Sequence, residues 1–401
     1  MSEPRKPLIP LDDALASLLA QIEPLAGSET LATADARGRV LAVDLVSPVD
    51  VPPADNSAMD GYALRSADAA SLLPVTQRIP AGSVPQPLPA GEAARIFTGA
   101  QVPEGADTVV MQEHTDLVDG QLRVTQPVAS GANVRRRGED VRAGSVVLPA
   151  GTRVDAVSLG LAATAGAAQL TVTRRPRVAV FSTGDELVMP GEPLPPGAIY
   201  NSNRFTLRAL LEGLGCEVVD LGIVPDRLDA TRAALRDAAS RADVILTSGG
   251  VSVGEEDHLR PAVQAEGRLD LWAIAIKPGK PFAYGRVGQA HFIGLPGNPV
   301  SSLVTFLVLV RPALLKLQGA SRLVPRGYRI AAGFDWPRPD KRREFLRVRL
   351  DDEGGLALFG NQSSGVLTSA FWADGLLDNP PGQAFAKGDA VRFVPFSELL
   401  A

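Results

Sequence analysis

The chain contains 401 residues, of which 45 % are hydrophobic and 21 % are charged, so it can bury several cores and is too apolar to be disordered. Its formal net charge of -5, from 40 Lys and Arg against 45 Asp and Glu, excludes the polybasic field that binding to nucleic acid or to an anionic membrane requires. The single cysteine excludes an intramolecular disulfide and a cysteine-rich zinc site, and it fits a reducing compartment.

The N-terminus and the apolar runs indicate the compartment. The first residues, MSEPRKPLIPLDDAL, lack the apolar core of a signal sequence. The most apolar run, residues 303–310, ends at Arg311 and is shorter than the roughly 20 residues that cross a bilayer. We therefore predict a cytoplasmic protein that binds neither membrane nor nucleic acid.

Two small units are expected before residue 176. Apolar residues at helical spacing predict an amphipathic helix over residues 11–22. Short apolar runs divided by Pro and Gly predict a β module over residues 46–140, with a turn at Asp119-Gly120. Residues 143–172 are rich in Ala and Gly and are expected to return beside the N-terminal helix, which would make the β module an insertion.

A βαβαβ rhythm begins at residue 177. Strands are predicted over residues 177–181, 217–223 and 244–246, with helices over 205–214 and 228–242 between them. Two further strands, 269–276 and 291–295 with a hairpin between them, precede a helix over 300–317. After Gly319 four more strands are predicted, over residues 328–331, 345–350, 356–359 and 390–394.

The predicted fold class is multidomain α/β plus β. A central three-layer α/β/α domain with a mostly parallel sheet covers residues 176–321. The remaining units are an elongated, partly helical N-terminal domain, the inserted β module and a C-terminal β-barrel-like domain. Their predicted limits are residues 1–45 with 141–175, 46–140 and 322–401.

Five loops of the α/β region carry most of the residues suited to chemistry. They span residues 182–186, 224–226, 247–257, 277–281 and 295–301. Because right-handed crossovers place strand-to-helix loops on one edge of a parallel sheet, we expect all five to converge. Glycine-freed amides, hydroxyls, two lysines and several carboxylates suit a phosphorylated ligand with a hard cation. The glycines at 249, 250 and 254 match neither common nucleotide-binding signature.

Each loop also has a purely structural interpretation. Residues 182–186 could be a strand-to-helix turn with a capping acid, and 248–254 a tight turn. Lys277 and Lys280 could be solvated surface charges, and Asn298 could cap a helix start at 296–299. The arginines at 135–137 could form an ion-paired face rather than an anion clamp. In the β module, the segment DNSAMDGYA at 55–63 could satisfy local turns, or Asp60 and Thr98 could offer oxygens to a ligand.

Seven motifs in order along nearly the whole chain resemble the molybdopterin molybdenumtransferase family of molybdenum-cofactor biosynthesis, which includes the C-terminal domain of gephyrin. The motifs are DNSAMDGYA at 55–63, TGA at 98–100, RRRGED at 135–140, STGDEL at 182–187, SGGVSVGEED at 248–257, IKPGKP at 276–281 and LPGNPVS at 295–301. The resemblance implies that molybdate is inserted into the dithiolene of adenylylated molybdopterin and that AMP is released in a step assisted by Mg²⁺.

The resemblance also implies roles for individual residues. Lys277 and Lys280, with the loop 296–301, are candidates to hold molybdate, and residues 248–254 to cradle a pterin phosphate. Asp60, Glu186 and Asp226 are assigned to magnesium or to positioning the attacking oxygen. The residues expected to bind substrate are Thr98, Arg135, Asp140, Thr183, Gly184, Ser248, Gly249, Gly250, Ser252, Gly254, Asp257, Pro296, Gly297, Asn298, Pro299, Ser301 and Ser364.

The family is dimeric, with its cleft between the α/β domain of one subunit and the β module of the other. A homodimer is therefore implied, in which Asp60, Thr98, Arg135 and Asp140 act across the interface. A molybdopterin adenylyltransferase and molybdoenzyme acceptors are possible further partners. In the segment Gln362-Ser363-Ser364-Gly365, serine follows the glutamine where many relatives have glycine, and this departure bears on Ser364 as the expected oxyanion contact. Arg347 is another possible molybdate ligand.

Two other functions are weighed against molybdenum insertion. Proteins with a related α/β domain adenylylate molybdopterin, but the additional modules and DNSAMDGYA belong to the insertion family. A non-catalytic scaffold is the other alternative, because gephyrin also anchors receptors. Lys277, Asp60 and Glu186 favour an enzyme.

Overall fold

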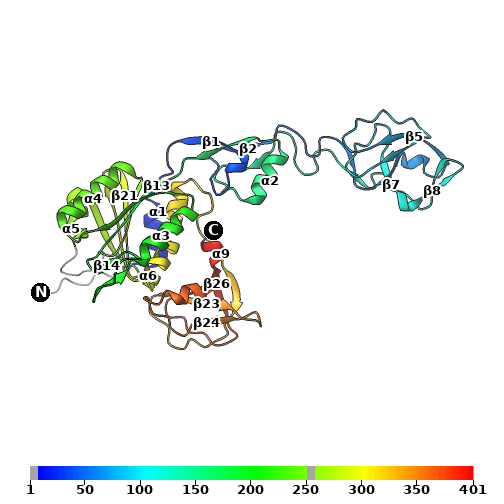
Figure 1. Cartoon of the computed structure of the whole chain (residues 1–401). Helices are drawn as coiled ribbons and strands as arrows, with labels where there is room; N and C mark the ends of the chain where they lie inside the picture. Colours follow the sequence, from blue (N-terminus) through cyan, green and yellow to red (C-terminus); the bar gives the residue numbers. More distant parts are fainter. Residues whose placement is uncertain (1–7, 251–257, 401) are drawn as a thin grey trace.

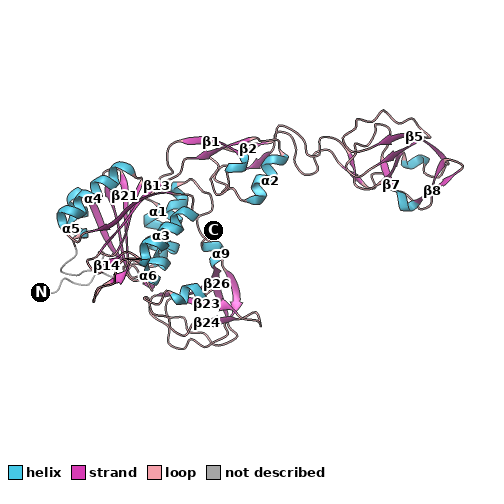
Figure 2. Ribbon diagram, viewed as in Figure 1, coloured by secondary structure: helices cyan, strands magenta, loops and turns pink. Residues whose placement is uncertain are grey.

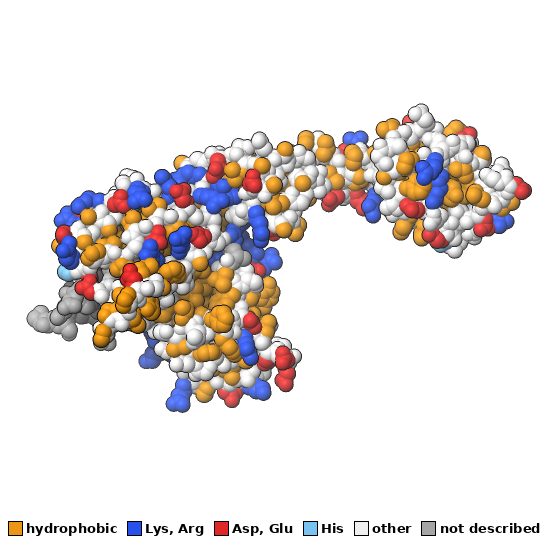
Figure 3. All heavy atoms as spheres, viewed as in Figure 1, with side chains coloured by type: hydrophobic (Ala, Val, Ile, Leu, Met, Phe, Trp, Pro, Cys, Tyr) orange, Lys and Arg blue, Asp and Glu red, His pale blue; other side chains and the backbone are white. Residues whose placement is uncertain are grey.

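The computed structural model describes residues 8–250 and 258–400. The molecule is elongated, with the α/β domain and the C-terminal domain at one end and the β module at the other (Figure 1). A small unit of strands and one helix lies between them. On the face drawn in Figure 3, acidic and basic side chains are interspersed rather than gathered into one basic field.

The α/β domain is built on a six-stranded sheet in the order β16-β13-β17-β21-β20-β18. β16 (Glu217–Val224), β13 (Arg177–Thr183), β17 (Val244–Ser248) and β21 (Ala290–Leu295) run parallel. β20 (Pro281–Val287) and β18 (Gly267–Ala273) complete the sheet in antiparallel pairing. The predicted mostly parallel sheet is therefore present, with one antiparallel side.

Helices cover both faces of this sheet (Figure 2). α3 (Ser202–Gly213) packs on one face, and its residues Leu207 and Leu211 join the largest core. α4 (Leu228–Arg241) and α5 (Leu259–Glu266) pack on the other face around Phe181. The sequence predicted α3 and α4 but not α5.

The longest helical segment runs from residue 299 to 317 and consists of α6 (Pro299–Thr305), a π-helical turn η4 (Phe306–Val310) and α7 (Arg311–Leu317). Among the described helices it is the one long and apolar enough to cross a membrane by length and composition, but 89 % of its most apolar window is buried. Its apolar side chains fill the core between sheet and helices, so burial within the fold accounts for its composition.

The N-terminal helix α1 (Leu11–Leu19) differs from the prediction in its packing partner. Its buried residues Leu11, Ala14 and Leu18 join the core of the α/β domain, where α1 contacts α7 and η4. Residues 143–172 therefore do not return beside it. An amphipathic pattern shows only that a helix needs a partner surface, and here the nearest large apolar surface belongs to the α/β domain.

The small middle unit is formed by chain segments on either side of the β module. β1 (Ser28–Ala32) pairs with β12 (Gln169–Thr173), and β2 (Leu45–Val46) pairs with β11 (Val146–Leu148). α2 (Ala156–Thr164) begins at Asp155, whose carboxylate accepts a hydrogen bond from Ser158 N. These pairings tie the outgoing and returning segments together before the chain enters the β module.

The β module contains a six-stranded sheet in the order β7-β4-β6-β5-β9-β8. These strands are Thr108–Met111, Gly61–Leu64, Ala93–Ile96, Leu73–Ile79, Gln121–Val124 and Thr115–Val118. β8 and β9 form a hairpin whose turn residues, Asp119 and Gly120, have φ values of 49° and 79°. The predicted turn is confirmed, because both positive φ values match the tight hairpin turn that Asp-Gly favours.

The C-terminal domain contains a sheet in the order β19-β23-β25-β26-β22, with β24 (Leu356–Leu358) paired to β23. The other strands are β19 (Ile276–Lys277), β22 (Tyr328–Ala331), β23 (Arg343–Leu350), β25 (Gly375–Asn379) and β26 (Ala390–Pro395), with short helices α8 (Thr368–Trp372) and α9 (Phe396–Leu399) beside them. The predicted strand over 269–276 is thus wrong at its end. It stops at Ala273, and β19 leaves the α/β sheet to pair with β23.

Candidate functional site

Four of the predicted loops meet at the carboxyl edge of the α/β sheet because of strand register. Ser182 at the end of β13 aligns with Ser248 of β17, and Ser248 aligns with Leu295 of β21. Thr183 aligns with Val224 at the end of β16. The ends of these four parallel strands therefore place the loops 182–186, 224–226, 248–250 and 295–301 side by side.

The fifth loop reaches the same edge by a different route. Pro281, at the start of β20, pairs with Ala273, and Ala283 pairs with Gly294 near the end of β21. Because β20 is antiparallel to β21, its first residue lies near the carboxyl end of β21. The expected convergence of residues 277–281 is therefore confirmed, although an antiparallel strand brings the loop there.

The glycine loop closes tightly on its neighbours. Gly249 N donates to the Leu295 carbonyl at 3.1 Å, and Ser182 Oγ lies 3.4 Å from Ser248 Oγ. Gly250 has φ +64°, and a Cβ added there would lie 3.0 Å from Thr183 Oγ1. A side chain at Gly250 would thus meet both backbone strain and close contacts. Ser252, Gly254 and Asp257 lie outside the described residues.

The segment after β13 does not form the capping turn considered above. After Gly184 and Glu186 the chain enters a short strand, β14 (Leu187–Val188), which pairs with β15 (Ile199–Tyr200). Glu186 is exposed and Asp226, after the neighbouring strand β16, is half-buried. Two acidic residues from adjacent strand ends therefore remain accessible from this edge.

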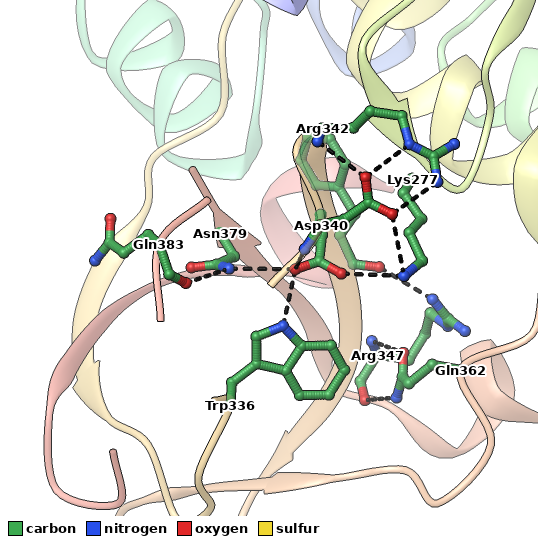
Figure 4. Close-up of polar contacts among 10 residues, drawn as sticks. Lys277, Trp336, Asp340, Arg342, Arg347, Gln362, Asn379 and Gln383 are labelled. Atoms are coloured by element: carbon green, nitrogen blue, oxygen red, sulfur yellow. Dashed lines mark hydrogen bonds and ion pairs between the residues drawn. The ribbon is translucent and has the colours of Figure 1, made fainter. Parts of the chain in front are cut away.

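The lysine loop lies where the α/β domain meets the C-terminal domain. Gly279 has φ +114°, and an added Cβ would lie 2.3 Å from Thr305 Oγ1 of α6, so the loop is pressed against that helix. The Lys277 side chain is 47 % exposed and its ammonium lies 3.3 Å from Glu344 and 3.4 Å from Asp340 (Figure 4). Lys280 is exposed and has no ion-pair partner in the part of the chain that the structure describes.

The start of α6 accepts a contact from α3 and makes one to the C-terminal domain. Asn203 Nδ2 of α3 donates to the Gly297 carbonyl at 2.7 Å, and Val300 N donates to the Ser364 carbonyl at 2.9 Å. Asn298 occupies the N-cap position, but its side chain makes no capping hydrogen bond. Pro296 and Ser301 are buried, whereas Gly297 and Asn298 are exposed, so the tip of this loop is open to a ligand.

The C-terminal domain contributes Arg347, which is 1 % exposed. Its guanidinium donates to Ser369 Oγ at 3.1 Å and to the Phe345 carbonyl at 3.0 Å, and burial lowers its pKa to about 10. Within the described residues no carboxylate neutralises it. A buried positive charge held by neutral acceptors therefore lies beneath the segment that carries Ser364.

In the β module, Asp60 and Thr98 are brought together as expected. The Asp60 carboxylate accepts hydrogen bonds from Thr98 N and Thr98 Oγ1, both at 2.8 Å, and these bonds lower the pKa of Asp60. Arg135 and Asp140 line a cavity of about 400 Å³ together with Gly99, the residue after Thr98. The four candidate residues of this module thus lie on neighbouring segments.

The arginine run 135–137 is partly an ion-paired face. Arg136 pairs with Asp55 at 2.7 Å and Arg137 with Asp50 at 2.5 Å, and both arginine side chains are exposed. Arg135 has no ion-pair partner among the described residues and faces the cavity. The structural interpretation therefore holds for two of the three arginines.

The described residues of one chain do not assemble a complete metal site. Among the described residues, no group of three or more His, Cys, Asp or Glu side chains is placed to hold a metal ion. Asp60 lies in the β module, at the opposite end of the molecule from Glu186 and Asp226 (Figure 1). The proposed trio cannot act together unless its members come from different subunits.

The sequence did not predict the two carboxylates, Glu344 and Asp340, that lie beside Lys277. Glu344, Asp340 and Arg342 come from the C-terminal domain, and Trp336 Nε1 donates to Glu344 Oε2 at 2.8 Å. In the sequence, Glu344 stands in the segment REFLR, where nothing marks it as buried. Its environment depends on a strand pairing with the α/β domain that local pattern does not reveal.

Comparison with protein families places three models in order along the chain. A model of the MoeA N-terminal region (domain I and II) matches residues 9–166, and a probable molybdopterin binding domain matches residues 179–316. A model of the MoeA C-terminal region (domain IV) matches residues 329–396. Together they span most of the chain.

Similar proteins match most of this chain and most or all of their own length. The molybdopterin molybdenumtransferase of Haemophilus influenzae is 41 % identical over 98 % of this chain and 100 % of its own. Molybdopterin molybdenumtransferase 2 of Mycobacterium tuberculosis is 40 % identical over 88 % of this chain and 90 % of its own. The crystal structure of the molybdopterin biosynthesis moeA protein from Pyrococcus horikoshii OT3 superposes with a TM-score of 0.84, at 29 % identity, over 97 % of this chain and 100 % of its own.

The fold and the gathered loops define a multidomain transferase of molybdenum cofactor biosynthesis. Within that class, the chain belongs to the molybdopterin molybdenumtransferase family.

Proposed function

We propose that this protein inserts molybdate into adenylylated molybdopterin and releases AMP. The observation that carries the proposal is the meeting of the lysine loop, the start of α6 and Ser364 at one edge of the α/β sheet. Molybdate is a tetrahedral dianion, which ammonium groups and backbone amides bind by charge and hydrogen bonding.

Within this site, the proposed anion ligands are Lys277, Lys280 and the loop 296–301, with Ser364 beside them. Lys280 and the tip residues Gly297 and Asn298 are accessible, as a ligand requires. Arg347 adds a buried positive charge beneath the same segment. Residues 248–250, one strand away, are proposed to receive the pterin phosphate.

Magnesium is proposed to assist the step. Mg²⁺ in proteins is commonly held by one or two carboxylates together with water and substrate phosphates. Glu186 and Asp226 fit this requirement, because both are acidic, follow adjacent parallel strands and are not fully buried. When bound, the ion would neutralise charge on the substrate's phosphates. In this chain the two carboxylates would hold it.

A homodimer with a shared cleft is part of the proposal. Asp60, Thr98, Arg135 and Asp140 lie on one module, and that module is distant from the α/β domain of its own chain (Figure 1). A second subunit would bring them to the carboxyl edge. A cytoplasmic location and exchange with a molybdopterin adenylyltransferase and with molybdoenzyme acceptors belong to the same proposal.

The function is tested by AMP release from purified protein with adenylylated molybdopterin, titrated against molybdate. Wild-type protein should release AMP only when molybdate is added. Lys277→Ala should weaken molybdate binding by about 1 to 3 kcal/mol, the loss of a charge-assisted contact. Lys341→Ala, an exposed lysine of the C-terminal domain, is the matched control and should retain wild-type affinity.

The alternatives are not favoured. Adenylylation of molybdopterin would appear as ATP consumption with free molybdopterin, but the N-terminal and C-terminal regions match the family of the insertion enzymes. A non-catalytic scaffold would bind the adenylylated substrate without releasing AMP. AMP release that did not depend on molybdate would contradict the proposed function.

A further inference from the structure

Among the described residues, Glu344 carries the most deeply buried carboxylate near the proposed anion site. Its side chain is 1 % exposed. Oε2 accepts hydrogen bonds from Trp336 Nε1 at 2.8 Å, from Asp340 N at 3.1 Å and from Asn379 Nδ2 at 3.4 Å. Three neutral donors therefore fix this oxygen and leave Oε1 to face Lys277.

Lys277 supplies the charge that balances Glu344. The ammonium lies 3.3 Å from Oε1, and within the described residues it is the one cation at ion-pair distance from Glu344. Burying a carboxylate without a paired cation is costly, so the contact is strongly constrained. The two residues also face each other across the β19–β23 pairing, where Lys277 aligns with Glu344.

A second carboxylate, that of Asp340, also lies beside the Lys277 ammonium. Asp340 Oδ2 lies 3.4 Å from Lys277 Nζ, and Arg342 fixes Asp340 with two side-chain hydrogen bonds of 2.9 and 2.8 Å. Arg342 N adds a third bond, at 3.0 Å. An ammonium has three donors, of which one hydrogen-bonds Glu344 while Asp340 lies at ion-pair distance, so donor capacity remains for a ligand.

The two carboxylates oppose anion binding by charge, so attraction alone does not explain their presence beside an anion-binding lysine. The two carboxylates instead restrict the orientation of the Lys277 ammonium, since a lysine side chain without such contacts samples many rotamers. We propose that Glu344, supported by Asp340, is a positioning residue that aims the Lys277 ammonium at the reacting oxyanion. The inference rests on the proposed function and assigns the C-terminal domain a part in it.

The test separates kcat from KM in molybdate-dependent AMP release. In Glu344→Gln the lysine keeps its charge and one opposing charge is removed, so the KM for molybdate should not rise. Because the ammonium is no longer aimed, kcat should fall by about tenfold, as misplaced reacting groups do. Asp378→Asn is the matched control. It removes another buried carboxylate, of the neighbouring strand β25, which pairs with Arg343 instead, and kcat should stay near wild type.

A double-variant cycle shows whether Glu344 acts through Lys277. In a Lys277→Met background, Glu344→Gln should cause no further fall in kcat. The melting temperature gives a second measure that needs no activity. Lys277→Met leaves the buried Glu344 carboxylate without a cation. The double variant Lys277→Met/Glu344→Gln should therefore have a higher melting temperature than Lys277→Met alone. If Glu344→Gln does not fold, Asp340→Asn replaces it in the test. This variant alters a more exposed partner of the same lysine, so kcat should also fall, but by less.

Failure of the inference is distinguishable from failure of the function. If wild-type protein releases no AMP with molybdate, the proposed function is wrong. If wild type is active but Glu344→Gln keeps its kcat, or raises only the KM for molybdate, the positioning role is wrong and the function stands. A further loss from Glu344→Gln in the Lys277→Met background would also overturn the positioning role.

Discussion

Arg347 and Glu344 are buried charged residues of the same strand, β23, but they differ in whether an oppositely charged side chain lies beside them. Glu344 is matched by a cation, Lys277, whereas Arg347 is held by a hydroxyl and carbonyl groups. With its pKa lowered to about 10, Arg347 stays protonated at neutral pH. Its charge is therefore uncompensated by the described carboxylates and adds to the positive potential near Ser364, where we place an anion.

At the same scale, His291 of β21 predicts a pH dependence of stability. The side chain is 6 % exposed, and burial lowers its pKa to about 4. The unfolded chain therefore binds a proton near pH 6.5 that the folded protein does not accept until about pH 4. Stability present above pH 6.5 should be lost as the pH falls through this window, by up to about 3 kcal/mol.

The matched variant for this prediction is His291→Asn, which cannot titrate. Urea unfolding of both proteins, measured between pH 7.5 and 4.5, isolates the histidine because the carboxylates titrate in both. The wild-type midpoint should fall more steeply than that of the variant. Parallel pH profiles would show that His291 ionises as readily in the folded chain as in the unfolded one.

At the scale of elements, the contact between the lysine loop and α6 predicts that Gly279→Ala is strongly destabilising. The residue has φ +114°, and the new Cβ would lie 2.3 Å from Thr305 Oγ1 and 3.1 Å from Ile276 Cδ1. Backbone strain and steric overlap together should cost about 2 to 4 kcal/mol. The melting temperature measures the loss, and the KM for molybdate should rise because the loop carries Lys277 and Lys280.

Gly354→Ala is the control for backbone strain alone, since Gly354 has φ +82° with nothing within 4 Å of an added Cβ. It should cost only about 1 to 2 kcal/mol. Adding Thr305→Ala to Gly279→Ala should recover part of the stability by removing the nearest atom. Equal losses for the two glycine variants, with no recovery, would mean that the loop does not press on α6.

Most elements of the α/β domain follow from local pattern, and the differences have local causes. β13, β16 and β17 are short apolar runs separated by amphipathic helices, which the sequence displays directly. The strand predicted over 269–276 ends early because Ile276 pairs with the C-terminal domain. Which sheet a two-residue strand joins is decided by tertiary packing, and local propensity does not encode it.

Part of the candidate site could also be predicted from the sequence. The gathering of four loops at one edge follows from the handedness of crossovers, so it could be inferred from strands and helices alone, whereas the loop 277–281 arrives through the antiparallel strand β20. The buried partners of Lys277 could not, because Glu344, Asp340 and Trp336 come from another domain. Phe205 illustrates the same limit, since it is an apolar residue at the start of the predicted helix 205–214 yet is 51 % exposed.

At the scale of the whole molecule, the candidate residues fall into two groups at opposite ends. Asp60 and Thr98 are hydrogen-bonded to each other in the β module, whereas Lys277 lies at the junction of the α/β and C-terminal domains (Figure 1). Two-stranded connections through the middle unit separate the groups. Under the proposed shared cleft, a single chain would carry two half-sites, and a symmetric dimer would have two complete ones.

Complementation between subunits tests this arrangement most directly. Asp60→Asn and Lys277→Ala chains carrying different tags are co-expressed, and the mixed dimer is purified and assayed for molybdate-dependent AMP release. In a shared cleft both defects fall in one site and the other site is intact, so the mixed dimer should keep about half of the wild-type activity while each pure variant is nearly inactive. A mixed dimer no more active than the pure variants would contradict a cleft built from two chains.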